Sequence, residues 1–501
     1  MPCSTADEVK EAAAGLAGHF GERCVAWKYL LPVADGGGLL AIGLDAVAVA
    51  GFARSWPQIK MVSGECASTD SPVGEWRSTS WPAVAVGADS RKGRPRPADL
   101  LQLVAPGGAV AWAGNGEAVP TDAALKAAGF EFINRYAALP PGRVKVLVPL
   151  RTGRATSAAL NLYIPGERRN RALVLAMRML ARFGLQRLLG RSQVVIARRP
   201  GRLARADYLL DWLSVRLGRP VAETAIYPGT NDAPGRRKVT LQLLDTEARV
   251  VGIAKVADTP AAAAALEREA ALLDRLQRDP VLADSIPRVA ARGAWHGHAV
   301  QVQTPLEHTA ASFRPVWTPW HEQFTEHLAA VDTAVIPLGR WPGLPALMRW
   351  VRRDAGNESG PGERERRVIE RAVSRLVDVR LPCHRVHGDF TPWNVFVHRG
   401  RVMVFDWEYS EAPGLPLSDL FHFHIIAESC LRRPFTTERL FSSAPRSLGI
   451  EKQLNRFCDS LADYNPGRPL GGDLSTDYFH LLAAAECSRP NSPIRHRRAR
   501  P

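Results

Sequence analysis

A polar loop between two apolar, strand-like segments places the strongest constraint on how this 501-residue chain can fold. The segment 385–397 ends with the apolar run 395–397 and carries Asp389 and Asn394 in its polar middle. A second apolar segment, 402–405, leads directly into Asp406. Because a short loop between paired strands holds its side chains at one edge, we expect these three polar groups to lie together.

These three residues suit a site that brings a divalent cation close to a reacting hydroxyl group. The side-chain oxygens of Asn394 and Asp406 are hard ligands, which Mg²⁺ prefers. The carboxylate of Asp389 could orient a hydroxyl group and take its proton. Phosphoryl transfer asks a protein for little more than such positioning and charge neutralisation. The alternative interpretation is a chance grouping of Asp and Asn residues in a solvated loop.

The sequence around this loop resembles the aminoglycoside phosphotransferase and choline kinase family. Residues 387–394, with the sequence HGDFTPWN, and residues 405–408, with the sequence FDWE, carry the resemblance. A downstream PLSDL sequence at 416–420 also fits the family pattern. The resemblance covers about 221–485 and implies a protein-kinase-like fold in that part of the chain.

The resemblance also implies a role for each polar residue of the motif. Asp389 would be the catalytic base, and Asn394 and Asp406 would bind Mg²⁺. His387 and Asp419 would give structural support to the catalytic loop. The implied cofactors are ATP and Mg²⁺.

A nucleotide-binding lobe is expected upstream of the motif. The strand-like segment 251–256 carries Lys255 among apolar neighbours, and the resemblance implies that this lysine contacts the α- and β-phosphates of ATP. Glu269, on an amphipathic helical segment, would be its ion-pair partner. Glu267 lies about 200° away around the helix and cannot face the same site. An exposed strand lysine is the alternative interpretation of Lys255.

Two further segments of this lobe have a possible place near a nucleotide. The segment 227–238 contains two glycines and could cover the phosphates, but it lacks a G-x-G-x-x-G order. An ordinary hairpin connection is an equal alternative for it. The segment 300–307 resembles the linker between kinase lobes, where backbone groups would meet the adenine.

The N-terminal part has a different pattern. From about 22 to 150, short apolar segments alternate with alanine-rich helical segments, which indicates an α/β unit. We expect strands at 39–44 and 58–62 and a helix at 46–56. The Ser-, Pro-, Gly- and Arg-rich segment 68–97 is expected to be a long loop.

This part faintly resembles a class I methyltransferase. A cofactor-binding turn needs several glycines, and only Gly43 stands where a Gly-x-Gly would be expected. We therefore predict a Rossmann-like domain without a cofactor, with an active methyltransferase as the alternative.

The length of the chain exceeds what one hydrophobic core usually serves, so two or three domains are expected. The predicted fold class is α/β plus α+β, with a Rossmann-like domain followed by a two-lobed kinase-like domain. We predict a degenerate methyltransferase-like domain at 1–165, a basic helical linker at 166–215, a kinase-like domain at 216–487 with lobes at 216–308 and 309–487, and a basic disordered tail at 488–501.

The formal net charge of +15 could attract nucleic acid, anionic lipid or a phosphorylated ligand. Charge alone does not choose among them, and we favour a solvated tail over a nucleic-acid contact. The apolar run 39–52 is too short to span a bilayer, so no membrane insertion is expected. Scattered cysteines and the absence of a signal-peptide pattern favour a cytoplasmic protein.

The predicted function is ATP- and Mg²⁺-dependent phosphoryl transfer to a hydroxyl group of a small molecule such as a sugar, an aminoglycoside-like compound or a choline-like alcohol. One alternative is a catalytically inactive kinase-like module that binds or regulates a partner. Another is a bifunctional protein with an N-terminal methyltransferase. The residue pattern sets no oligomeric state.

Overall fold

The chain divides into two compact units in the computed structural model. The N-terminal unit comprises Met1–Glu267 and Val289–Pro305, and the C-terminal unit comprises Arg268–Arg288 and Leu306–Pro501. The structure describes residues 22–34, 37–44, 46–53, 55–56, 58–62, 79–87, 95–115, 119–140, 144–162, 168–188, 192–229, 238–306, 315–353, 361–430, 436–442, 449–467, 473–489 and 494.

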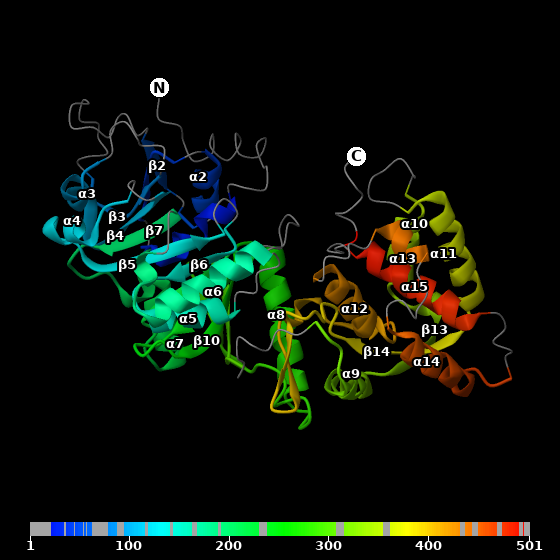
Figure 1. Cartoon of the computed structure of the whole chain (residues 1–501). Helices are drawn as coiled ribbons and strands as arrows, with labels where there is room; N and C mark the ends of the chain where they lie inside the picture. Colours follow the sequence, from blue (N-terminus) through cyan, green and yellow to red (C-terminus); the bar gives the residue numbers. More distant parts are fainter. Residues whose placement is uncertain are drawn as a thin grey trace. The chain divides into compact units, whose positions relative to one another are not determined.

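A twelve-stranded sheet organises the described part of the N-terminal unit (Figure 1), with the strand order β11-β12-β10-β9-β8-β6-β5-β7-β4-β3-β1-β2. The strands are β1 (Leu39–Ile42), β2 (Ile59–Val62), β3 (Trp81–Val86), β4 (Val104–Asn115), β5 (Glu131–Leu139), β6 (Val146–Pro149), β7 (Ser192–Arg198), β8 (Glu223–Tyr227), β9 (Lys238–Leu244), β10 (Val250–Ala257), β11 (Val289–Trp295) and β12 (His298–Gln303). Strands β2, β1, β3 and β4 are parallel neighbours, and the remaining pairs are antiparallel.

Helices cover both faces of this sheet because successive strand residues point to opposite sides. The helices are α2 (Ala46–Phe52), α3 (Pro97–Leu103), α4 (Asp122–Ala127), α5 (Gly153–Leu162), α6 (Arg168–Arg182) and α7 (Leu209–Leu217). Leu39 packs with α2, α7 and the 3₁₀ helix η1 (Glu22–Leu30), whereas Leu40 packs with α3 and α4. Strands with two apolar faces are typical of a sheet buried between helices.

The predicted elements of the N-terminal part are partly confirmed. Strands β1 and β2 and helix α2 form where they were expected. The prediction of a loop over 68–97 is wrong at β3, which lies in the interior of the sheet, while 68–78 and 88–94 lie outside the described residues. Its alanines and valines are buried on both sides, so they show no alternation, and the surrounding Ser, Pro and Arg residues obscure so short a strand. A Rossmann-like identity for this part remains a prediction.

The segment predicted as a basic helical linker, 166–215, contains more than helices. Helix α6 is confirmed, but β7 lies within the sheet between β4 and β5. Its apolar run Val194 to Ala197 is buried although arginines flank it in the sequence. The strands expected in the small kinase lobe continue the same sheet through the pairing of Leu147 with Ile226. The predicted boundary at 216 therefore falls inside one compact unit.

The C-terminal unit is mainly helical, with a three-stranded sheet and a separate hairpin in its described residues (Figure 1). Its elements include α9 (Pro319–Val331), β13 (Ala334–Pro337), α10 (Leu344–Val351), α11 (Glu363–Leu376), β14 (Arg380–Val386), β15 (Val395–His398), β16 (Arg401–Val404), β17 (Glu411–Gly414), α12 (Ser418–Cys430), α13 (Thr437–Ser442), α14 (Glu451–Tyr464) and α15 (Leu474–Ser488). Helix α15 packs against α10, α11, α12, α13 and α14. Tyr478, Phe479 and Leu482 on this helix are buried, so α15 forms the centre of the unit's core.

Part of the predicted disordered tail belongs to this core. Arg489 donates a hydrogen bond from Nη1 to the backbone oxygen of Gly388 at 2.7 Å, and Ile494 is buried. The prediction was therefore wrong at Arg489, whose charge has a fixed partner. Most of the tail, at 490–493 and 495–501, lies outside the described residues.

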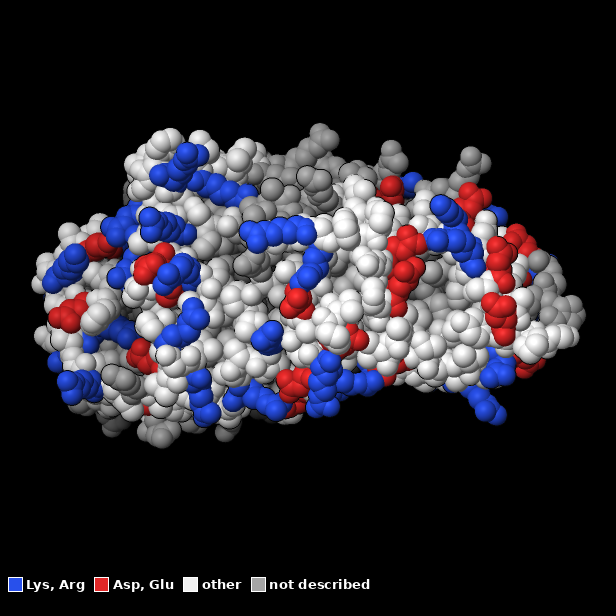
Figure 2. All heavy atoms as spheres, turned by 90° about the horizontal axis from the view of Figure 1, so that it is seen from below, with Lys and Arg blue, Asp and Glu red and all other residues white. Residues whose placement is uncertain are grey.

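Basic and acidic side chains are intermixed on the face drawn in Figure 2, where Lys and Arg are spread among Asp and Glu. No helix among the described residues is both long enough and apolar enough to cross a membrane.

A buried charged cluster joins η1 to the part of the sheet expected to form the small kinase lobe. Lys28 Nζ lies 3.1 Å from both carboxylate oxygens of Asp258, next to the end of β10. Tyr29 donates a hydrogen bond to the same carboxylate, and His298 Nδ1 lies 3.3 Å from it. Burial would raise the pKa of Asp258, but the hydrogen bond from His298 and the charge of Lys28 hold it well below its usual value. The cluster therefore attaches η1, where the described chain starts, to this end of the sheet.

Replacing Lys28 with Met should destabilise the N-terminal unit by about 3 kcal/mol, because a buried carboxylate would lose its cationic partner. Urea unfolding followed by circular dichroism would measure the change. The matched control is Arg96→Met, which removes an exposed ion pair with Asp99 and should leave the unfolding curve nearly unchanged. A Lys28→Met variant that unfolds like the wild type would show that the cluster does not stabilise the unit.

Candidate active site

The hairpin of β15 and β16 brings two of the predicted site residues to the same end of two paired strands. Val395 pairs with Val404, so the residues just outside this pair, Asn394 and Phe405, face each other. Phe405 N donates a hydrogen bond to Asn394 O at 3.1 Å. Asp406 follows Phe405 directly, and it therefore lies at the same end of the hairpin as Asn394.

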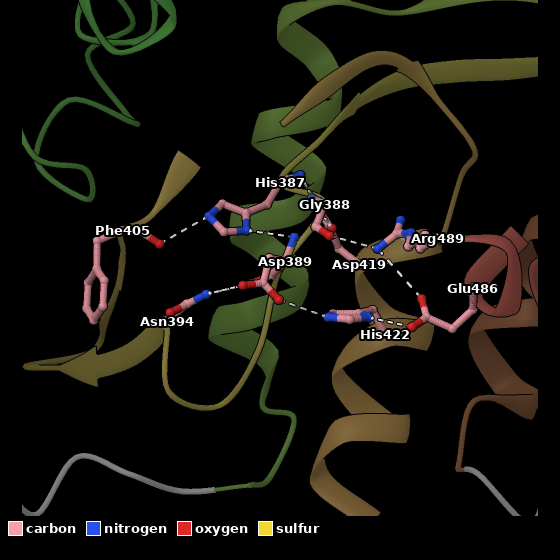
Figure 3. Close-up of polar contacts among 9 residues, drawn as sticks. All are labelled: His387, Gly388, Asp389, Asn394, Phe405, Asp419, His422, Glu486 and Arg489. Atoms are coloured by element: carbon pink, nitrogen blue, oxygen red, sulfur yellow. Dashed lines mark hydrogen bonds and ion pairs between the residues drawn. The ribbon is translucent and has the colours of Figure 1, made fainter. Parts of the chain in front are cut away.

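The loop between β14 and β15 brings Asp389 into contact with Asn394 (Figure 3). Asn394 Nδ2 donates a hydrogen bond to Asp389 Oδ2 at 2.7 Å and another to the Asp389 backbone oxygen at 3.0 Å. Asn394 is buried, whereas the side chain of Asp389 keeps 29% of its surface exposed. With Nδ2 committed to Asp389, the atom of Asn394 that could bind a metal is Oδ1.

His387 ties this loop to the strand end before Asp406. Asp389 N donates a hydrogen bond to His387 Nδ1 at 3.3 Å, so Nε2 carries the proton and donates to Phe405 O at 3.2 Å (Figure 3). Burial lowers the pKa of His387 although the nearby carboxylates of Asp419, Asp389 and Asp406 oppose this shift. The imidazole is therefore neutral at pH 7, and the three carboxylates lie around it.

Asp419, in the first turn of α12, holds the start of the loop. Its carboxylate accepts hydrogen bonds from His387 N at 2.7 Å and from Gly388 N at 3.0 Å. Gly388 has a φ of +81°, and a Cβ atom there would lie 2.2 Å from Tyr409 O. Only glycine fits this position, because any side chain would meet both a strained backbone conformation and a steric clash.

Asp406 occupies a strained position that the surrounding structure fixes. Its φ is +68°, in the left-handed region, which costs roughly 1–2 kcal/mol for a residue other than glycine. The next residue, Trp407, donates its backbone N–H to Glu269 Oε1 at 3.0 Å. Glu269 is buried on α8 (Pro260–Leu276). The predicted helix glutamate thus holds the backbone directly after the predicted metal ligand.

Lys255 lies on β10, opposite Thr240 of β9 and Gln301 of β12. Its side chain is 4% exposed, so the alternative of an exposed strand lysine is wrong. Lys255 belongs to the N-terminal unit and Glu269 to the C-terminal unit, and their ion pair remains a prediction. The glycine-containing loop predicted to cover phosphates lies mostly at 230–237, outside the described residues.

Three residues that the sequence interpretation missed form a chain of contacts that starts at Asp389. His422 Nε2 lies 3.2 Å from Asp389 Oδ1, and its Nδ1 lies 3.0 Å from Glu486 Oε1. Arg489 adjoins Glu486 and reaches the backbone of Gly388 (Figure 3). His422 follows Asp419 by three positions, so helical spacing could have placed both on one face. No local pattern connects Glu486 to the loop, because the contact is tertiary.

The donor set has the composition that Mg²⁺ takes beside a nucleotide. Among the described residues, no group of three or more His, Cys, Asp and Glu side chains could hold a metal ion by itself. Mg²⁺ is usually bound by one or two protein groups, with substrate phosphates and water completing its shell. Asn394 Oδ1 and the Asp406 carboxylate fit this pattern.

Several solved structures are similar to the chain. The aminoglycoside phosphotransferase APH(3'')-Id from Streptomyces rimosus ATCC10970 is 17% identical, and the match covers 52% of this chain and 92% of that one with a TM-score of 0.30. An aminoglycoside-3'-phosphotransferase of type VIII is 20% identical over 56% of this chain and 100% of that one, with a TM-score of 0.31. WbdD, solved with the kinase inhibitor LY294002, is 10% identical over 95% of this chain and 88% of that one, with a TM-score of 0.22.

No curated protein matches the chain closely enough to count as a relative. Residues 235–440 match the sequence model of the phosphotransferase enzyme family. This range contains Lys255 and Glu269 as well as the loop and hairpin that hold Asp389, Asn394 and Asp406. The match to the phosphotransferase enzyme family therefore lies in the C-terminal half of the chain.

Proposed function

We propose that this protein transfers the γ-phosphoryl group of ATP, with Mg²⁺, to a hydroxyl group of a small molecule. The observation that carries the proposal is the hydrogen bond that fixes the Asp389 carboxylate to Asn394, at the end of the hairpin that carries Asp406. The family match over 235–440 supports the same reaction class. Sugars, aminoglycoside-like compounds and choline-like alcohols are the acceptor classes that we propose to test.

Each residue of the loop has a role that its environment allows. The partly exposed carboxylate of Asp389 would orient the acceptor hydroxyl and take its proton as transfer proceeds. Asn394 Oδ1 and Asp406 would hold Mg²⁺, which neutralises charge on the phosphates when it is bound. His387 and Asp419 would keep the loop in place through the backbone contacts described above. Such positioning is most of what phosphoryl transfer requires.

Lys255 and Glu269 would complete the nucleotide site. Lys255 is buried on β10, and its side chain would contact the α- and β-phosphates of ATP, as the resemblance implies. Glu269 would pair with this lysine, as the resemblance implies. The hydrogen bond that Glu269 accepts from Trp407 N would then connect the nucleotide site to the backbone next to Asp406.

Replacing Asp389 with Ala should lower kcat on the order of a thousandfold, about 4 kcal/mol of barrier, because the acceptor hydroxyl would lose its orienting base. An assay of ATP consumption across a panel of alcohols would measure the loss, with calorimetry to check that the variant still binds ATP. Asp463→Ala, on the exposed surface of α14, is the control and should keep full turnover. Equal turnover by Asp389→Ala and wild type would show that Asp389 is not the catalytic base. ATP binding without transfer to any alcohol would favour the inactive kinase-like module.

We also propose that the N-terminal part is a Rossmann-like domain without a bound cofactor. Its strands β1 and β3 are parallel neighbours. The helix that follows β1 and the helix that follows β3 pack on opposite faces of the sheet, and such sheets bind ligands at the point where this change of face occurs. Gly43 and Gly87 lie at the ends of these strands, and a Cβ atom on Gly87 would lie 2.2 Å from Gly43 O. The two backbones therefore close against each other at this point.

Calorimetric titration of the full chain with S-adenosylmethionine should give no binding heat, because backbone atoms lie against each other where a ligand would approach β1 and β3. Titration of the same sample with ATP and Mg²⁺ serves as the positive control. Saturable heat with S-adenosylmethionine would instead support the bifunctional alternative.

A further inference from the structure

We propose that His422 and Glu486 form a charged pair that positions the carboxylate of Asp389 for phosphoryl transfer, an inference that rests on the function proposed above. Neither residue is part of the sequence motif. They would act as positioning residues, because His422 contacts Asp389 and Glu486 contacts His422.

The geometry places a carboxylate oxygen within hydrogen-bond distance of each ring nitrogen of His422. Its Nε2 lies 3.2 Å from Asp389 Oδ1, and its Nδ1 lies 3.0 Å from Glu486 Oε1. A neutral imidazole has one N–H and one lone pair, so one carboxylate would then face a lone pair instead of a donor. With His422 6% exposed and Glu486 2% exposed, water has little access to relieve that repulsion.

Arg489 extends this pair back to the catalytic loop. Its Nη1 lies 3.6 Å from Glu486 Oε2 and donates a hydrogen bond to Gly388 O at 2.7 Å. Gly388 directly precedes Asp389, so the chain of contacts begins and ends on adjacent residues of the loop (Figure 3). Negative and positive groups alternate along it, in the order Asp389, His422, Glu486 and Arg489.

The pKa values agree with this geometry. Burial would lower the pKa of His422, but Glu486 and Asp389 outweigh burial and the repulsion from Arg489 and raise it to about 9. Burial would raise the pKa of Glu486, yet His422 and Arg489 lower it to about 2. Both partners are therefore charged across the neutral range.

The pair has a direct consequence for Asp389. Asn394 holds Oδ2 of its carboxylate, and His422 holds Oδ1, so rotation of the carboxylate is prevented. Each oxygen keeps a further lone pair for an acceptor hydroxyl. A carboxylate held in one orientation can orient the acceptor hydroxyl for proton transfer. Holding the acceptor in a fixed orientation removes a large part of the activation barrier in reactions of this kind.

A buried ion pair that only stabilises the fold is the competing explanation. It predicts variants with lower melting temperatures but an unchanged dependence of kcat on pH. The positioning role predicts a change in the pH profile itself. The imidazolium charge is lost as pH rises through its raised pKa, so kcat of the wild type should fall with a midpoint near pH 9.

The experiment compares the kcat profiles of wild type, Glu486→Gln, His422→Gln and His424→Gln between pH 6 and 10. Glu486→Gln should move the alkaline midpoint down by at least one pH unit, because the anion that holds the proton on His422 is gone. His422→Gln should lower kcat about tenfold at pH 7, lose this midpoint and leave the KM for ATP nearly unchanged. His424→Gln is the matched control on the same helix: its pKa is lowered to about 4 by burial, so it should keep the wild-type midpoint. Identical midpoints in wild type and Glu486→Gln would overturn the positioning role.

A second measurement works without turnover. Nuclear magnetic resonance titration of the His422 ring in the full chain should give a midpoint near pH 9, and a lower one in Glu486→Gln. If no alcohol accepts phosphate, the proposed function fails, and this titration still decides whether the charged pair exists. If transfer occurs but His422 titrates near its ordinary value of about 6.5, the pair is overturned and the proposed function stands.

Discussion

The loop that carries Asp389 depends on one carboxylate that accepts two backbone hydrogen bonds. Asp419 binds the N–H groups of His387 and Gly388, which lie where the chain leaves β14 and no strand partner is available for them. Buried N–H groups without partners are costly, so the turn at Gly388, with its φ of +81°, forms only because this acceptor is present. The backbone position of Asp389 follows from that anchor. Every proposed function of the loop therefore rests on a residue that need not touch a substrate.

The site is further held by contacts that end on backbone atoms. Asn394 reaches the backbone of Asp389, His387 reaches Phe405 O, and Glu269 reaches Trp407 N. Phe405 and Trp407 flank Asp406, so the strained conformation of Asp406 is fixed from both sides. Strain of this kind persists only where the surroundings determine it more than once. As the proposed metal-binding residue, Asp406 would need little reorganisation when Mg²⁺ binds.

The sequence was informative where the relevant residues are close along the chain. The spacing of Asp389, Asn394 and Asp406 reflects a loop and a hairpin, both of which are local structures. Strands β3 and β7 were missed because their apolar runs are short and lie among Ser, Pro and Arg residues, which are typical of loops. Each forms a strand only through pairing with distant segments of the sheet. His422 lies one helical turn after Asp419, but its function depends on Glu486, 64 residues away. Periodicity cannot show that contact.

Each unit contains a cluster in which several side chains donate to one carboxylate. Asp258 takes donors from Lys28, Tyr29 and His298, and Asp389 takes them from Asn394 and His422. The desolvation cost of such groups is recovered only when the set is complete, because removing one member leaves another uncompensated. Alternating charges also cancel one another, so the low dielectric of the core strengthens each contact without building up net charge. The carboxylate of Asp389 is therefore fixed by its polar neighbours although it stays partly exposed.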